Sequence, residues 1–183
     1  MNKKIIVKNT ITLDIHGYNN IPIIVRDKEN ILAYAQVEKL GRSNYFIRCE
    51  VIKLLKLLIV QYNIDTIIFE QNKLFIDKID RHPDPIVYRN ILCGFGIQIA
   101  IEDNFYNNVT YIFSLPNKDW QNTILNSSVK YSIDLYKAHI LKQSLSKESL
   151  DLIDKNNYYK ALCLSESIWF PNLMNVKYQI NKN

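Results

Sequence analysis

The chain opens with short runs in which apolar and polar residues alternate, the pattern of half-buried β-strands. The first run, Thr10 to Ile15, has apolar side chains at odd positions and threonine or aspartate at even positions. A second run covers Pro22 to Val25. After a polar turn at 27–30, a third covers Ile31 to Val37. Runs so close in sequence predict an antiparallel meander of three strands.

The apolar spacing then changes to steps of three and four residues. From Ile47 to Tyr62 this spacing predicts an amphipathic helix that ends near Asn63. A strand from Thr66 to Glu70 follows. Pro85, in the sequence His-Pro-Asp-Pro, predicts the first turn of a helix that runs to about Asp103.

The second half continues this alternation of strand and helix. The pattern from Val109 to Ser114 predicts a fifth strand. Two amphipathic segments follow, at about 118–125 and 129–143. A last helix is expected from about Asn157 to Trp169. Two glycines in the preceding long helix, Gly94 and Gly96, indicate close packing against the sheet. This order predicts an α/β fold, a mixed five-stranded sheet flanked by helices, in one domain over residues 1–183.

Composition narrows the class of protein. Of 183 residues, 48% are hydrophobic and 22% charged, as in ordinary soluble globular proteins. Because no run of about 18 apolar residues occurs and the N-terminus has no secretory pattern, we expect a cytoplasmic protein without a membrane partner. Three scattered cysteines without a CxxC motif indicate reduced thiols. The net charge of +5 is compatible with a polyanionic partner.

Two acids stand out because each closes an apolar strand. Asp14 ends the first run and Glu70 ends the fourth. A right-handed crossover puts those two strands side by side and parallel, so both carboxylates are expected at one edge of the sheet. Charge is costly to desolvate, and the expected use of such a pair is to bind a divalent cation through oxygen. His16, close by, is expected to be a turn residue.

These motifs and their order resemble those of the RuvC-type Holliday junction resolvases, which have an RNase H-like fold. Leu-Asp-Ile-His-Gly at 13–17 resembles the first-strand motif of that family, and Ile-Ile-Phe-Glu-Gln at 67–71 resembles its fourth-strand motif. The resemblance implies a structure-selective endonuclease that cuts branched DNA with Mg²⁺ or Mn²⁺ at Asp14 and Glu70. It also implies a homodimer, because a four-way junction has twofold symmetry.

The last family motif, a pair of aspartates three residues apart before Ala-Leu, differs here. Aligning Ala161 and Leu162 puts Asn157 and Lys160 at the two acidic positions. Lysine cannot bind a metal. On one helix, residues 157, 160, 161 and 164 fall on the same side, so Lys160 is expected to face the site and to lie between Asp14 and Glu70 as a counter-ion. Alternatively, a shifted register lets Asp151 and Asp154 supply the acids.

Two functions therefore remain open: a metal-dependent junction endonuclease whose catalysis is weakened or lost, and an inactive RNase H-like domain that acts as a DNA-binding or protein-interaction scaffold. Asp14, Glu70, Asn157 and Lys160 are the candidate catalytic positions. A phosphate-contacting surface is predicted from basic side chains that otherwise form a solvated helix face and loop. These are Lys53, Lys56, Lys73, Lys78 and Arg81.

Overall fold

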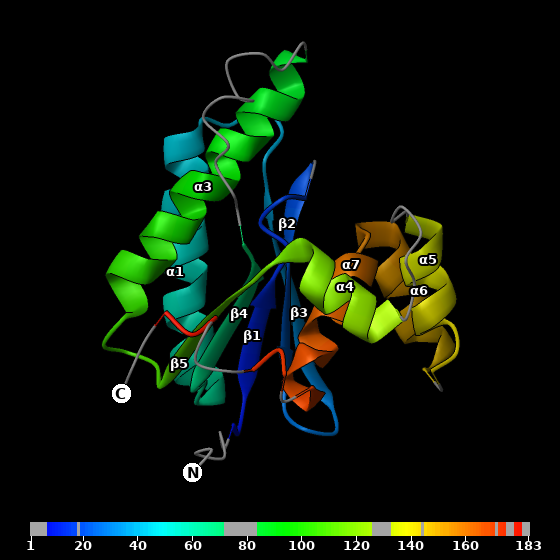
Figure 1. Cartoon of the computed structure of the whole chain (residues 1–183). Coiled ribbons are helices and arrows are strands. Elements are labelled where there is room, and N and C mark those ends of the chain that lie inside the picture. Colours follow the sequence, from blue (N-terminus) through cyan, green and yellow to red (C-terminus); the bar gives the residue numbers. More distant parts are fainter. Residues whose placement is uncertain are drawn as a thin grey trace.

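The computed structural model describes residues 7–17, 19–71, 84–125, 133–143, 145–170, 172–174 and 178–180. Its strands form one sheet in the order β3-β2-β1-β4-β5 (Figure 1). β1 pairs with β2, and β2 with β3, in antiparallel fashion, whereas β1, β4 and β5 are parallel. The mixed five-stranded sheet predicted from the sequence is confirmed. The bounds are β1 Thr10–Leu13, β2 Asn20–Arg26, β3 Ile31–Glu38, β4 Thr66–Glu70 and β5 Tyr111–Leu115.

The turn after β1 is tight and depends on a glycine. A Cβ atom at Gly17 would lie 2.0 Å from the backbone oxygen of Asn20, so no larger residue fits there. The backbone N–H of Asp14 donates to the carbonyl of Pro22, which carries the β1–β2 pairing one residue past the strand. Asp14 is therefore held rigidly although it follows the last strand residue.

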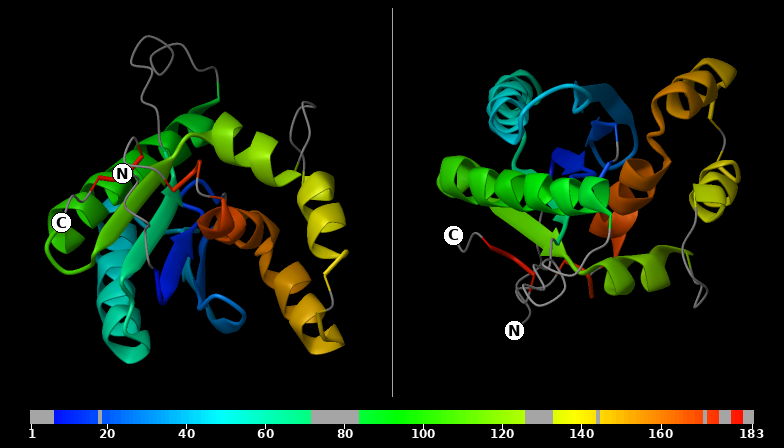
Figure 2. Two further views of the ribbon diagram at one scale, coloured as in Figure 1. Left: turned by 60° about the horizontal axis from the view of Figure 1, so that its bottom comes forward. Right: turned by 90° about the horizontal axis from the view of Figure 1, so that it is seen from above.

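Two long helices cover one face of the sheet: α1 (Asn44–Tyr62) and α3 (Pro85–Phe105) (Figure 2). The Ser43 side chain accepts a hydrogen bond from the Phe46 N–H and so begins α1, and Asn63 ends it in the left-handed conformation. The expectation that Gly96 packs against the sheet is wrong. A Cβ there would lie 2.9 Å from Cδ of Arg48, so Gly96 makes room for α1 instead.

The opposite face is covered by shorter elements from the last third of the chain (Figure 2). They are α4 (Asn117–Leu125), α5 (Ile133–Ile140), α6 (Lys147–Asn156), α7 (Tyr159–Ser165) and a 3₁₀ turn (Glu166–Trp169). The sequence predicts one last helix from about Asn157 to Trp169. In the structure this region is α7, which begins at Tyr159 and ends at Ser165, followed by the 3₁₀ turn. The α6 helix, capped by the Ser146 side chain, was not predicted as an element.

The sheet separates two apolar cores. Odd residues of β1, such as Ile11 and Leu13, face α1 and α3, while Ile24 and Ile68 face α4 to α7. Every residue of β1 and β4 is buried. A side chain at the carboxyl end of either strand therefore emerges directly from the centre of the molecule.

Candidate functional site

Asp14 and Glu70 lie together at the carboxyl edge of the sheet, because β1 and β4 are parallel neighbours in register. Thr10 pairs with Thr66, and Leu13 with Phe69, so the next residue of each strand is one of the two acids. Only 6% of Asp14 and 4% of Glu70 is exposed. Two carboxylates this well buried need compensating positive charge or hydrogen-bond donors.

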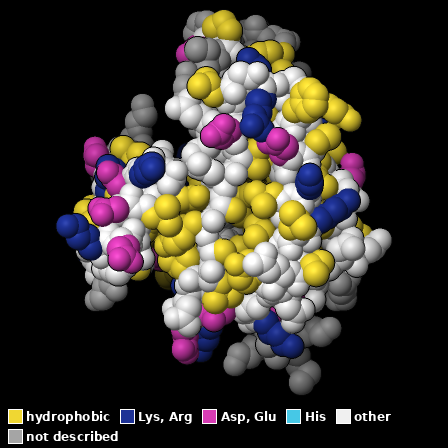
Figure 3. Space-filling view, turned by 180° about the vertical axis from the view of Figure 1, so that it is seen from behind, with side chains coloured by type: hydrophobic (Ala, Val, Ile, Leu, Met, Phe, Trp, Pro, Cys, Tyr) yellow, Lys and Arg dark blue, Asp and Glu magenta, His cyan; other side chains and the backbone are white. Residues whose placement is uncertain are grey.

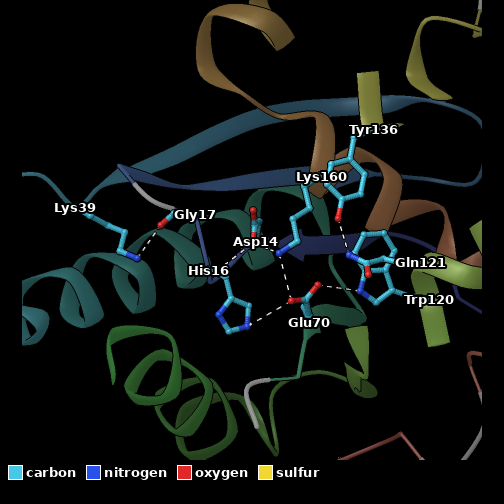
Figure 4. A network of polar contacts seen from close by, with 9 residues as sticks. All are labelled: Asp14, His16, Gly17, Lys39, Glu70, Trp120, Gln121, Tyr136 and Lys160. Carbon is cyan, nitrogen blue, oxygen red and sulfur yellow. Dashed lines mark hydrogen bonds and ion pairs between the residues drawn. The ribbon is translucent and has the colours of Figure 1, made fainter. Parts of the chain in front are cut away.

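Lys160, the second residue of α7, supplies that charge (Figure 4). Its ammonium Nζ lies 3.1 Å from Oδ1 of Asp14 and 3.3 Å from Oε1 of Glu70. One cation thus contacts both acids, and the three side chains come from three elements far apart in the sequence. Because α7 packs against β1, β2 and β4, the position of the ammonium is fixed by the core beneath it.

The charges reinforce one another. Burial alone would raise the pKa of the Asp14 carboxyl, but the Lys160 ammonium and the hydrogen bond from the His16 backbone N–H hold that pKa below its ordinary value. Burial alone would lower the pKa of Lys160, but Asp14 and Glu70 together raise it. At neutral pH Asp14 is therefore a carboxylate and Lys160 an ammonium ion.

Glu70 is held on both of its oxygens. Oε2 accepts a hydrogen bond of 3.0 Å from the indole N–H of Trp120, which is on α4 and fully buried. Nε2 of His16 lies 3.7 Å from Oε1, which is too long for a hydrogen bond. Burial lowers the pKa of His16, which favours the neutral ring. The backbone N–H of His16 donates to Oδ1 of Asp14 at 3.2 Å, so this turn residue also orients the first acid.

A second layer of polar groups lies behind Trp120. Its ring stacks on that of Tyr136, with centroids 6.0 Å apart and planes 17° from parallel. The Gln121 amide donates to the Tyr136 hydroxyl at 2.5 Å. Burial raises the pKa of Tyr136, so its hydroxyl stays protonated. These contacts pack α4 and α5 around the acids and restrict the orientation of Trp120.

The donor set does not fit a divalent metal. Within the described parts of the chain, no three His, Cys, Asp or Glu side chains gather closely enough to bind one. Two-metal phosphodiester cleavage needs carboxylates that share two cations roughly 4 Å apart. Here two carboxylates already share an ammonium ion, whose charge repels an incoming cation.

The other candidates for the last acidic motif do not reach the site. Asn157 is exposed and ends α6 with φ of 55°, before α7 begins, so its placement on the same helix face as Lys160 is wrong. Asp154 lies on the exposed side of α6, 2.8 Å from Nζ of Lys137. Asp151 is exposed on the same helix. The shifted register therefore does not bring a third acid to Asp14 and Glu70.

The predicted basic surface is described only in part. Lys53 and Lys56 are exposed on α1, roughly 14 and 18 Å along the helix from its start at the carboxyl edge. With Tyr45, Arg48 and residues of α3 they line a groove of about 590 Å³. The remaining predicted members, Lys73, Lys78 and Arg81, fall outside the described residues.

Sequence reasoning missed two residues next to the site. The sequence does not indicate that Trp120 lies at the site, because a single tryptophan in an amphipathic helix is usually a core residue. Lys39 is also buried, although it follows the exposed Glu38 at the end of β3. Its ammonium donates to the carbonyl of Gly17 at 2.8 Å and thus holds the loop that carries His16. Burial lowers the pKa of Lys39.

Comparison with known proteins identifies the fold. The chain is similar to RuvC of T. thermophilus in complex with a Holliday junction substrate, with 8% sequence identity and a TM-score of 0.58. That match covers 94% of this chain and 99% of the other. A second Thermus thermophilus RuvC structure has 10% identity and a TM-score of 0.55, over 93% and 98%. No protein-family model and no curated protein matches the sequence. In the described residues, no helix has the length and apolar character needed to cross a bilayer.

The likeness extends over nearly the whole of both chains, so it concerns the complete arrangement of strands and helices. The RuvC-type, RNase H-like fold expected from the sequence is confirmed.

Proposed function

We propose that this chain with the RuvC fold is a branched-DNA-binding domain that has lost metal-dependent cleavage. The observation that carries the proposal is the double contact of Lys160 with Asp14 and Glu70, at 3.1 and 3.3 Å. The lysine provides the positive charge that a cation would otherwise bring, and it cannot activate a water molecule as a metal does. The acids then stabilise the fold at this edge.

Branched DNA as the ligand is supported by the fold and by the charge of the chain. One of the similar structures is a RuvC bound to a Holliday junction substrate. The chain has 23 basic and 18 acidic residues, an excess that suits a polyanion. Lys53 and Lys56 on α1, together with Lys73, Lys78 and Arg81, are the proposed phosphate contacts. Since these contacts involve no metal, binding is expected to persist in EDTA.

The second candidate, a Mg²⁺- or Mn²⁺-dependent junction endonuclease, is favoured by one observation. Both strand-end acids are present and lie at the same edge of the sheet. For this activity a metal ion would have to displace Lys160 from both carboxylates. The two functions therefore predict opposite results in the presence of metal.

The test measures binding and cleavage separately. In EDTA, wild-type protein is expected to bind a four-way junction more tightly than a linear duplex of equal length. Replacing either Lys53 or Lys56 by glutamate should weaken binding and lower its dependence on salt. Lys28→Glu, at an exposed turn between β2 and β3, is the matched control and should bind as wild type does.

With Mg²⁺ or Mn²⁺ the wild-type protein is expected to leave the junction uncut. Cleavage that is abolished by Asp14→Asn would establish the endonuclease instead. Equal affinity for the junction and the duplex, or no binding to either, would overturn the proposal and support a protein-interaction scaffold.

A further inference from the structure

The two edges of the sheet differ in what covers them. At the β5 edge, the segment 178–180 adds a short extended stretch: the Ser114 N–H donates to the Tyr178 carbonyl at 3.0 Å, and the Ile180 N–H donates to the Ile112 carbonyl at 2.7 Å. The bridge between this segment and β5 is antiparallel. An extended segment thus binds to one edge of the sheet through its backbone groups.

The β3 edge has no such cover in the described structure. β3 is the last strand of the sheet, beside β2 and under α1. Of its eight residues only Val37 is buried. Apart from the bonds to β2, no backbone hydrogen bond of β3 is found in the part of the chain that the structure describes. The outer backbone groups of this strand are therefore available to a partner.

The register shows which backbone groups these are. The Lys39 N–H donates to the Asn19 carbonyl, so the β2–β3 pairing extends to these two residues. Because hydrogen-bonded pairs alternate along an antiparallel ladder, the backbone groups of Ala35 and Val37 also point to β2. The residues between them direct their N–H and C=O groups away from the sheet. These residues are Tyr34, Gln36 and Glu38.

This row of donors and acceptors selects the kind of partner. The outward groups recur at every second residue of β3, which is the spacing of a neighbouring strand. A helix bonds its own backbone groups internally, and a DNA duplex has no matching row of donors and acceptors. The complementary partner is therefore an extended polypeptide segment.

Apolar side chains flank the edge on the face that α1 covers. We define the edge patch as Ala33 and Ala35 of β3 with Leu54 and Leu57 of α1; Leu57 is 60% exposed, and the others are half-buried. The two leucines lie on the side of α1 opposite to its groove with α3. Figure 3 shows apolar side chains gathered at the centre of this side of the molecule, with charged groups mostly around them. The small alanines leave room for larger apolar side chains of a partner strand.

The carboxyl end of β3 has a charge that a partner can neutralise. Glu38 is exposed and makes no ion pair among the described residues. The next residue, Lys39, is buried and donates to the Gly17 carbonyl. β3 itself contains no lysine or arginine, so a second copy of this strand would leave Glu38 without a counter-ion. A partner with a basic residue at this position is complementary to the edge.

We propose that the β3 edge binds an extended segment of another protein, which adds one more strand, antiparallel to β3. The segment has apolar side chains at every second position, packed on the edge patch, and a lysine or arginine opposite Glu38. Its main-chain bonds to β3 provide affinity, and its side chains provide specificity. This inference goes beyond the proposed DNA-binding function and does not depend on it, because it rests on the edge strand alone.

The probe is a synthetic peptide with blocked ends and the sequence Lys-Val-Thr-Leu-Thr-Val. In the antiparallel register its lysine lies opposite Glu38, and its last four residues lie opposite Gln36 to Ala33. Side chains of directly opposite residues share a face, so the valines and the leucine point to the edge patch while their N–H groups point away from β3. N-methylation of these three apolar residues therefore leaves the bonds to β3 intact and prevents the peptide from forming sheets with itself.

The matched control peptide has the same sequence but is N-methylated at the lysine and the two threonines, whose N–H groups bond to β3. Isothermal titration calorimetry with the intact protein should show binding of the first peptide. The control, which loses three backbone bonds, should bind more weakly by a factor of about ten or more. Equal binding of the two peptides, or no binding of the first, would overturn the proposal.

An exchange of charge tests the register. Glu38→Lys should weaken binding of the lysine peptide, and a peptide with glutamate in place of the lysine should bind this variant more tightly than it binds wild type. Because Glu38 is exposed, the variant should keep the thermal midpoint of wild type. Glu29→Lys, in the exposed turn between β2 and β3, is the matched control and should bind both peptides as wild type does. If Glu38→Lys leaves both affinities unchanged, the proposed register is wrong.

A change in the backbone tests the edge itself. Gln36→Pro removes one outward N–H at a position where an edge strand tolerates proline. It should keep the circular dichroism of Gln36→Val, which retains the N–H, yet bind the first peptide more weakly than Gln36→Val does. Light scattering without peptide tests the other occupant. A wild-type dimer that Gln36→Pro dissociates would show that a second copy fills the edge, and would refute a foreign segment as its partner.

Discussion

Two ion pairs between lysine and aspartate show how differently the same groups act in two regions of the molecule. Lys137 on α5 lies 2.8 Å from Asp154 on α6, with side chains 38% and 61% exposed. Lys160 lies 3.1 Å from Asp14, with side chains 21% and 9% exposed. The shorter pair is the weaker one, because water solvates and screens its charges. In the buried pair, each partner is left in an apolar environment if the other is lost.

The largest effect is expected from Lys160→Met. It leaves Asp14 and Glu70 buried side by side without a cation, and the free energy of unfolding should fall by about 3–5 kcal/mol at neutral pH. Urea denaturation measures this loss. The double variant Asp14→Asn/Lys160→Met, which also removes one negative charge, should recover part of it. An unchanged stability of Lys160→Met would mean that the ion pairs contribute little.

Lys160→Met should also reverse the pH dependence of the free energy of unfolding. In wild type the pKa of Asp14 is lowered, so its contribution to stability is present above the ordinary carboxyl pKa of about 4 and is lost as the pH falls further. In Lys160→Met the burial of Asp14 raises its pKa without an opposing ammonium ion, so stability should increase as the pH falls from 8 to about 5. Denaturation curves across this range compare the two slopes. If the stability of both proteins changed with pH in the same way, Lys160 would not be what lowers the pKa of Asp14.

The next largest effect concerns metal binding. Lys160→Asp replaces the ammonium by a third carboxylate near Asp14 and Glu70. Mn²⁺ should then raise the stability of this variant by about 2.7 kcal/mol at a concentration 100 times its dissociation constant, and should not affect wild type. Thermal melting with and without Mn²⁺ provides the measurement. Lys160→Asn, which is neutral, is the matched control; an equal shift in wild type would show that the native residues already bind the ion.

A smaller loss is expected from Trp120→Phe. The phenyl ring keeps the contact with Tyr136, but Oε2 of Glu70 loses its donor at 3.0 Å. Removing a hydrogen bond to a charged group should cost about 1.5–3 kcal/mol. Chemical denaturation beside Tyr136→Phe, which keeps the stack and the indole donor, separates the loss of this bond from general disturbance of the packing. If both variants lose the same amount, the bond to Glu70 is not the cause.

The smallest effect should come from Lys137→Met. It removes the exposed partner of Asp154, and water solvates the carboxylate that remains. The thermal midpoint should scarcely move and should respond to added salt no more than that of wild type does. If Lys137→Met lost as much stability as Lys160→Met, the exposed and the buried ion pair would contribute alike.

The alternation of apolar and polar residues along the strands is sufficient to predict the sheet and to bring Asp14 close to Glu70. Strand ends are marked by a change from apolar to charged residues, and a parallel pairing leaves only one edge for them. The position of Lys160 followed from the register of Ala161 and Leu162, because both are buried in the structure and fix the face of α7.

Asn157 was misplaced because a helix end depends on local backbone geometry that periodicity does not reveal. The left-handed conformation at Asn157 separates α6 from α7 within two residues, so a continuous helix was the wrong model for 157–160. Trp120 and Lys39 reach the site through tertiary packing of elements far away in sequence. No spacing rule connects them to Asp14.

The short segment 178–180 has a consequence for aggregation. The Ser114 N–H donates to the Tyr178 carbonyl and the Ile180 N–H donates to the Ile112 carbonyl, so the segment occupies backbone groups at the edge of β5. A chain shortened before Tyr178 would leave these groups of β5 available to another extended chain. C-terminal deletions are therefore expected to aggregate.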